Sequence, residues 1–286
     1  LAGAPLVYDA EAIFALREIQ TAKIRDGRPL PKERARALIA QEVAWARGAD
    51  RVVAVSDEEA REFRRQGVGE VRVIGHALAP APTAPSFEER KDFLLVGAVH
   101  GWKNPNGDAL LWFAERVLPK LRGGMGEAPP RLIVAGYGTD SPELRQRLGL
   151  GVILVGPAAD LTPYYERARV FLAPTRFAAG IPMKAHEAAA RGLPMVTSEL
   201  IARQLGWTSG EELLSAPVSD EAAFAEACRR LYTDRPLWER LRAGALASVS
   251  RDCDPKRFSR GIHELLDELL GKKKTGCRAK PCTAGA

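Results

Sequence analysis

The residues best suited to chemistry stand close together between Gly180 and Glu187. Pro182 is typical of the first turn of a helix, and Gly180 before it allows a backbone turn that a side chain would obstruct. The start of such a helix offers free N–H groups and the positive end of the helix dipole, and Lys184 adds a positive charge. This combination predicts a phosphate-binding site. Glu187 could accept hydrogen bonds from sugar hydroxyls of the same ligand. The other interpretation of the spacing is an ordinary Lys–Glu surface pair.

The elements on either side are those that would position such a site. Residues 170–173 form a short apolar run, fit for a strand buried on both faces. A loop of small residues follows, and an Ala-rich helix is predicted over residues 182–191. Gly192 ends that helix, and a new strand begins after Pro194.

The same alternation of strand and helix runs through the whole second half of the chain. Strands are predicted at residues 93–97, 132–135, 152–155, 170–173 and 195–197, with helices between most of them. This pattern indicates an α/β fold with a doubly wound parallel sheet, whose ligand binds at the carboxyl ends of the strands. The loops over residues 97–104 and 174–180 carry the most useful side chains. After Leu214 the chain is expected to be helical.

A longer motif around the predicted phosphate site resembles the donor-binding signature of GT-B glycosyltransferases, in particular the family 4 type called glycosyl transferases group 1. The motif consists of Arg176-Phe177-Ala178-Ala179-Gly180, Lys184, Glu187-Ala188 and Gly192-Leu193-Pro194-Met195-Val196-Thr197. The resemblance extends over roughly residues 5–270 and is most specific from 93 to 197. It implies two Rossmann-like domains and a nucleotide diphosphate-sugar donor, linked to UDP or GDP.

The resemblance also implies roles for individual residues. Lys184 and the helix start would stabilise the leaving diphosphate, and Glu187 would bind the ribose, which makes these two the expected catalytic residues. Many members have a second Glu eight residues before this one, against the transferred sugar, and here that position is Ala179. The residue that contacts the transferred sugar is therefore unassigned. The resemblance further implies retention at the anomeric carbon, with Lys184 and the helix dipole in the place of a metal ion, so we expect a retaining, metal-independent transfer without a cofactor.

Further candidate donor-binding residues lie in the two loops. Gly97, His100 and Lys103 follow the first strand, where two glycines leave space for a diphosphate. The alternative is an ordinary Gly turn with exposed polar residues. Arg176 could bind phosphate with both arms of its guanidinium group or form a surface salt bridge. Ile181 is expected in the site next to Gly180. The turn over residues 136–138 has Gly-x-Gly spacing, which alone is weak evidence of nucleotide binding.

The first part of the chain is predicted to form a different unit. Residues 1–76 give strands and helices that resemble the last part of an N-terminal, acceptor-side Rossmann-like domain. Within them, Ser56 and Glu59 have the spacing of a capping box. A Pro-rich linker is predicted at 77–90, the donor-binding domain with its closing helices at 91–270, and a disordered basic tail at 271–286.

Composition narrows the choice of partners and compartment. The net charge of +6 is mixed in sign along the chain and accompanies no nucleic-acid-binding motif, so no nucleic acid partner is expected. Apolar runs are too short to span a membrane, although peripheral membrane contact is possible. The four cysteines have no metal-binding spacing, which favours free thiols in a reducing cytoplasm.

These observations predict a glycosyltransferase whose acceptor is a carbohydrate, lipid or protein. Because the first half of the acceptor domain is absent, we expect this chain alone to bind donor poorly and to be inactive. Two alternatives are a nucleotide-sugar epimerase of the same two-domain shape and a non-catalytic nucleotide-sugar-binding module. Convergence of Gly97, His100, Gly180, Lys184 and Glu187 on one cleft would favour the donor site, and a Glu187 side chain that points away from that cleft would contradict it.

Overall fold

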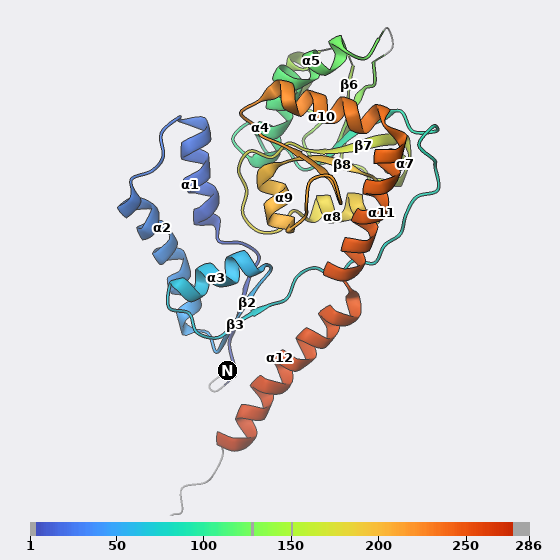
Figure 1. Ribbon diagram of the computed structural model, residues 1–286. Helices are drawn as coiled ribbons and strands as arrows, with labels where there is room; N and C mark the ends of the chain where they lie inside the picture. Colours follow the sequence, from blue (N-terminus) through green and yellow to red (C-terminus); the bar gives the residue numbers. More distant parts are fainter. Residues whose placement is uncertain (1–3, 127–128, 150, 277–286) are drawn as a thin grey trace, which may run out of the picture.

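The computed structural model describes residues 4–126, 129–149 and 151–276, which form two α/β units joined by a linker (Figure 1). The N-terminal unit contains a three-stranded parallel sheet in the order β1-β2-β3. Its elements are β1 (Val7–Ala10), α1 (Phe14–Arg25), α2 (Lys32–Ala44), the short helix η1 (Trp45–Gly48), β2 (Arg51–Ala54), α3 (Asp57–Arg65) and β3 (Val71–Val73).

The C-terminal unit contains a six-stranded sheet in the order β6-β5-β4-β7-β8-β9, with every neighbouring pair parallel. Its elements are β4 (Asp92–Val96), α4 (Pro105–Trp112), η2 (Phe113–Val117), α5 (Leu118–Gly123), β5 (Leu132–Ala135), α6 (Pro142–Arg147), β6 (Val152–Gly156), α7 (Thr162–Arg167), β7 (Ala168–Ala173), α8 (Met183–Ala190), β8 (Met195–Ser198), α9 (Glu199–Leu205), β9 (Leu214–Ala216), α10 (Glu221–Thr233), α11 (Arg235–Asp252) and α12 (Pro255–Gly276).

This strand order confirms the predicted doubly wound α/β fold and locates its binding crevice. The direction in which strands are added reverses between β4 and β7. In doubly wound sheets the crevice opens at the carboxyl ends of the two strands where the order reverses. The segments that leave those two ends are residues 97–104 and residues 174–182.

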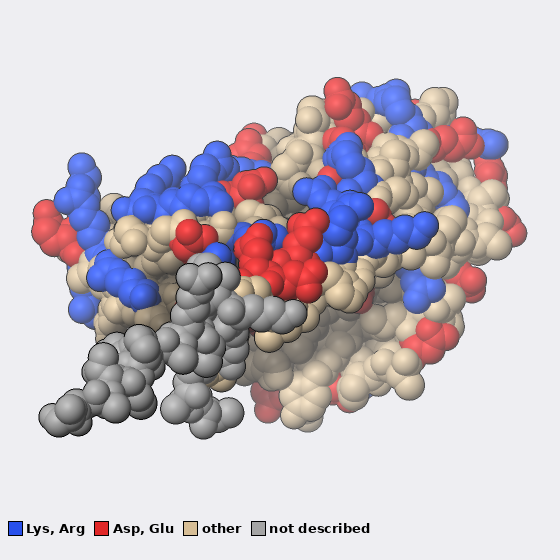
Figure 2. Space-filling view, turned by 90° about the horizontal axis from the view of Figure 1, so that it is seen from below, with Lys and Arg blue, Asp and Glu red and all other residues tan. Residues whose placement is uncertain are grey.

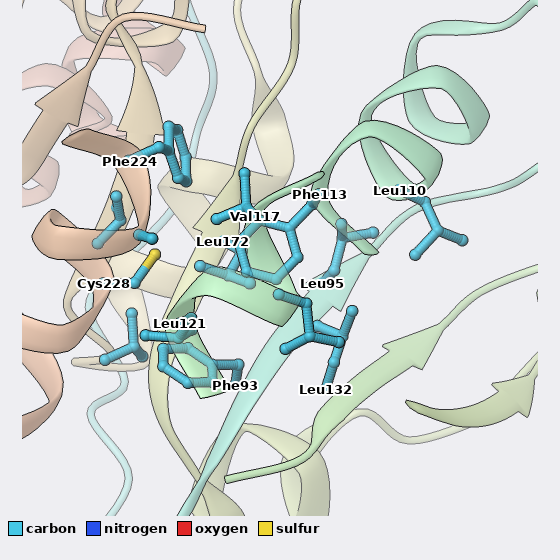
Figure 3. Packing of buried hydrophobic residues seen from close by; sticks show 14 of the residues in the cluster. Phe93, Leu95, Leu110, Phe113, Val117, Leu121, Leu132, Leu172, Phe224 and Cys228 are labelled. Carbon is cyan, nitrogen blue, oxygen red and sulfur yellow. The ribbon is translucent and has the colours of Figure 1, made fainter. Parts of the chain in front are cut away.

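Both faces of the large sheet are covered by helices, which explains why its strands are continuous apolar runs. On one face, Phe93 and Leu172 of the sheet pack with Phe224 and Cys228 of α10 (Figure 3). On the other face, buried alanines of α8 pack against the sheet. Because alanine side chains are short, α8 lies close to the sheet, and its first turn reaches the crevice.

One strand of the sheet was not expected from the sequence. Residues 214–216 form β9, which pairs in parallel with β8 and places Leu214 beside Val196. The prediction that the chain is helical from Leu214 onward is therefore wrong at its start. The segment Leu-Ser-Ala has weak strand propensity, and pairing with β8 determines its conformation.

The last helix connects the two units. α12 runs from the large unit along β2 and β3 (Figure 1), and Leu265 and Leu269 pack against Val53 and Ile74. Arg72 of β3 also forms ion pairs with two glutamates of this helix. The last helix of the chain therefore packs back against the N-terminal unit. The helix extends through Gly276, beyond the predicted start of the tail, and residues 277–286 lie outside the described chain.

The linker lies against the large unit. Arg90 at its end is fully buried and donates hydrogen bonds to the carbonyl oxygens of Tyr165 and Ala168 and to the Thr83 hydroxyl. Burial is the main cause that lowers the pKa of Arg90 to about 10. These contacts attach the end of the linker firmly to α7 and β7.

On the face shown in Figure 2, basic and acidic side chains are interspersed, and neither charge dominates the whole face. Among the described residues, no helix is long and apolar enough to cross a membrane. Cys228 and Cys253 are buried free thiols. The other two cysteines of the sequence lie outside the described chain.

Candidate functional site

The candidate site is built around the segment that joins β7 to α8, residues 174–182, and the first turn of α8. Gly180 has a positive φ of +77°, as the sequence argument for a turn at this glycine requires. Pro182 occupies the N-cap position of α8, one residue before the helix. No side chain caps this helix, and its first turn contains no acidic residue. The amides of Ala185 and His186 donate to the carbonyl oxygen of Pro182, and those of Met183 and Lys184 have no acceptor among the described residues, which is the arrangement expected of an anion site.

Lys184 lies in that first turn and points toward the other loop of the crevice. Its ammonium group donates a 2.6 Å hydrogen bond to Oδ1 of Asn106 at the start of α4. Nδ2 of Asn106 in turn donates to the carbonyl oxygen of Ala98, at 2.9 Å. Burial lowers the pKa of Lys184 to about 8. The structure thus connects the segments after β4 and β7 through one cationic group whose partner is a neutral amide.

Asn106 is a residue that the sequence analysis did not assign to the site. It was visible only as one of several polar residues near a predicted helix start, and nothing in that pattern indicated a contact with Lys184. Asn104 is the N-cap, since its Oδ1 accepts a 2.6 Å hydrogen bond from the Gly107 N–H. This cap leaves Asn106 free to reach across the crevice.

Gly97 makes this arrangement possible. A Cβ atom at Gly97 would lie 2.7 Å from Nδ2 of Asn106, so a side chain at position 97 would displace the Asn106 amide. Gly136 and Gly138 also pack against this loop, because their Cβ atoms would lie 2.4 Å and 2.3 Å from the carbonyl oxygens of Gly97 and Val99. The Gly-x-Gly turn therefore supports the loop by close packing.

His100 and Lys103 lie further out on the same loop. Both line a cavity of about 920 Å³ between this loop and helices α1 and α2. The ring of His100 packs against Tyr137, with ring centroids 5.4 Å apart. Lys103 is exposed, and it makes no hydrogen bond or ion pair with any described residue.

Arg176 is held by a carboxylate. Its Nε and Nη2 atoms donate to both oxygens of Asp108 on α4, at 2.7 Å and 2.6 Å. The Asp108 side chain is 7% exposed and that of Arg176 is 23% exposed, so this is a largely buried, two-bond ion pair. In this structure the guanidinium group fixes the 174–182 segment to α4, and a phosphate contact by Arg176 stays a prediction.

Glu187 lies one turn after Lys184 and faces α7. Its charge contributes, after burial, to a raised pKa of the Tyr165 hydroxyl on that helix. Its carboxylate forms no hydrogen bond or ion pair within the described part of the chain. Lys184 and Glu187 lie on neighbouring faces of α8: the Lys184 ammonium group contacts α4, and the charge of Glu187 acts on Tyr165 of α7.

Ile181, two residues before α8, and His186 on α8 lie near the linker. Both line a cavity of about 950 Å³ between the two units. The His186 ring packs against His76 of the linker region and against Trp207. Burial, with a smaller contribution from His76, lowers the pKa of His186 to about 4.

The five residues expected to share a cleft thus fall into several neighbouring groups. Gly97 and Lys184 are joined through Asn106, whereas His100 lines the cavity toward α1 and α2. Gly180 lies against the N-terminal unit, and Glu187 faces α7. In the described chain, no three His, Cys, Asp or Glu side chains form a group that could hold a metal ion.

Comparison with protein families gives one assignment. The model of the family "Glycosyl transferases group 1" matches residues 90–234, just over half of the chain. This range begins at the end of the linker and includes every strand of the large sheet. Comparison of the sequence with curated proteins gave no match.

Solved structures share the fold across both units at low sequence identity. HepE from Anabaena, in complex with UDP and glucose, superposes with a TM-score of 0.69 at 16% identity, over 92% of this chain and 71% of that one. Sucrose-phosphate synthase from Thermosynechococcus elongatus gives 0.68 at 20% identity, over 93% and 68%. A variant of TarM from S. aureus, in a complex that contains UDP, gives 0.71 at 12% identity, over 92% and 51%.

Proposed function

The chain belongs to the family of glycosyl transferases group 1, with a GT-B type fold, and we propose that it transfers a sugar from a nucleotide diphosphate-sugar to an acceptor without a metal ion. The observation that carries this proposal is the position of Lys184. Its ammonium group lies at the start of α8, which no side chain caps, and donates to the neutral Asn106; within the described ranges it forms no ion pair with a carboxylate.

The chemistry follows from where negative charge develops. The bond between the anomeric carbon of the sugar and the diphosphate oxygen breaks, and the electron pair stays on that oxygen. Lys184 and the free amides at the start of α8 stabilise this charge, the role that a metal ion has in other enzymes. A diphosphate beside Lys184 also raises the lowered pKa of its ammonium group and keeps it protonated. The sugar is transferred with retention of configuration.

Glu187 binds the ribose of the donor in this proposal. Its carboxylate has no partner within the described residues and lies on the α7 side of α8. The loop of residues 156–161 precedes α7 and offers backbone groups to the base. The nucleotide would then extend from this loop, across Glu187, to the diphosphate at Lys184.

The structural neighbours support a uridine nucleotide as the first ligand to test. HepE was solved in complexes with UDP and with UDP-glucose, and TarM in a complex with UDP. Saturation-transfer NMR of this chain with UDP, and in parallel with GDP, detects binding even when affinity is only millimolar. We expect transfer from the protein to the ribose protons of UDP.

Three variants make that experiment specific. Lys184→Ala is expected to reduce UDP affinity at least about tenfold, since a charge-assisted contact to phosphate is lost, and Glu187→Ala about fivefold. Lys256→Ala, which removes an exposed lysine on α12, is the matched control and should bind as the wild type does. Equal UDP signals from the wild type and Lys184→Ala would contradict the proposed function.

A further inference from the structure

The carboxylate of Glu59 on α3 lies at the boundary between the two units and contacts both of them. The sequence predicted that it closes a capping box with Ser56, and half of that box forms, since Ser56 Oγ accepts a hydrogen bond from the Glu59 N–H at 3.2 Å. The carboxylate does not return to Ser56. Its Oε1 accepts from the amides of Ile13, at 3.1 Å, and Gly180, at 3.0 Å. The second of these amides belongs to the segment before α8.

The segment around Gly180 is fitted closely to the N-terminal unit. A Cβ atom at this position would lie 2.7 Å from the carbonyl oxygen of Glu11, so only glycine permits the approach. Two residues earlier, the amide of Ala178 donates to Oε1 of Gln20 on α1, at 3.1 Å. Two backbone amides of the segment are therefore bound by side chains of the other unit.

The environment of Glu59 makes its position costly. The residue is 4% exposed, its contacts are amides, and no cation among the described residues is paired with it. Its other oxygen, Oε2, has no hydrogen-bond partner in the same part of the chain. Burial raises the pKa of the carboxyl group. A small cavity of about 30 Å³ beside Glu59, Ala179 and Gly180 has room for about one or two water molecules. An alanine at position 59 would avoid burying a carboxylate but would leave the amides of Ile13 and Gly180 without their acceptor, so the role of the carboxylate is to hold these two amides.

We propose that Glu59 is a positioning residue for the donor site: it fixes Gly180 and thereby sets the direction of the free amides at the start of α8. The conformation of residues 174–182 then depends on contact between the two units. If the units separate, Gly180 loses its acceptor and the segment becomes mobile. The last step, from loop position to donor affinity, rests on the proposed function.

Amide hydrogen exchange of the chain without ligand tests the contact directly. In Glu59→Ala we expect exchange in the peptide over residues 175–181 to accelerate about tenfold, because Gly180 loses its acceptor. Glu59→Gln keeps a carbonyl oxygen for both amides and should retain most of the protection. Glu58→Ala removes the exposed neighbouring carboxylate and should change nothing. Unchanged exchange of residues 175–181 in Glu59→Ala would overturn the proposal.

Two further arms complete the test. If Glu59→Ala does not fold, Glu59→Asp replaces it, since a side chain shorter by one methylene cannot reach both amides. Unchanged protection of residues 175–181 in that variant would also overturn the proposal. With UDP, we expect Glu59→Ala to bind about fivefold more weakly than Glu59→Gln, and equal affinities would refute the link to the donor site. Absence of UDP binding by the wild type, with the exchange pattern as expected, would refute the proposed function and leave the contact itself established.

Discussion

Two sets of contacts hold the segment between β7 and α8, and they differ in kind. The side chains of Arg176 and Lys184 contact α4 of the same unit. The backbone amides of Ala178 and Gly180 contact side chains of α1 and α3 in the other unit. The first set positions charge within one folded domain, whereas the second exists only while the two units touch. The difference suggests that charge placement and domain contact can be disturbed separately.

The largest expected effect comes from breaking the ion pair within the large unit. Arg176→Met leaves the carboxylate of Asp108 buried without a partner, and we expect the free energy of unfolding to fall by about 3 kcal/mol. Urea denaturation followed by tryptophan fluorescence measures this loss. Replacing both residues, as Arg176→Met with Asp108→Leu, removes the unpaired charge and should recover most of it. A single variant as stable as the wild type would show that the pair contributes little.

A smaller loss is expected from the contact between the units. Gly180→Ala introduces a side chain at positive φ and places its Cβ atom 2.7 Å from the Glu11 carbonyl oxygen. We expect the free energy of unfolding to fall by about 2 to 3 kcal/mol, partly from backbone strain and partly from the clash. The matched control is Gly210→Ala, because Gly210 also has positive φ but no atom within 4 Å of its Cβ position. Equal losses in the two variants would mean that the contact with Glu11 contributes nothing.

Gly97→Ala is expected to change ligand affinity more than stability. Its Cβ atom would displace the Asn106 side chain, which aligns Lys184. We expect UDP affinity to fall about three- to tenfold, measured by the same NMR titration. Gly69→Ala, at a glycine with open space around its Cβ position, should leave UDP affinity unchanged. Unaltered affinity in Gly97→Ala would indicate that Asn106 has no part in the site.

The last expected effect is a dependence on pH. In the folded chain without ligand, burial lowers the pKa of Lys184 to about 8 from its ordinary value of 10.5. Above pH 8 the folded chain has released this proton, and the unfolded chain still holds it, so stability should rise between pH 8 and 10. UDP affinity should fall over the same range, because binding must restore the proton. Lys184→Met should remove both trends, and their persistence in that variant would assign them to another group.

The sequence predicted best those parts of the fold that depend on local residue patterns. The doubly wound sheet followed from the alternation of apolar runs and helices, and the turn at Gly180 and the helix after Pro182 followed from residue types with few possible conformations. The strand over residues 214–216 was missed because only its neighbour β8 stabilises it.

The contacts between the units could not be predicted, for a physical reason. Every residue has an amide, so nothing in the sequence marks Gly180 as the partner of a glutamate 121 positions away. Glu59 also satisfied a local pattern, the capping box, which gave it a sufficient role without any distant contact. Asn106 was similarly hidden among polar residues at a helix start. Long-range partners of side chains depend on how the units pack, and local spacing does not encode that.

In the proposed donor site, Lys184 and the start of α8 bind the diphosphate of a nucleotide-sugar. A crystal structure of the chain with UDP is the strongest test of this site. We expect a phosphate oxygen about 3 Å from Nζ of Lys184 and the ribose beside Glu187. UDP bound in the cavity next to His76 and His186, with Lys184 still bonded only to Asn106, would contradict it.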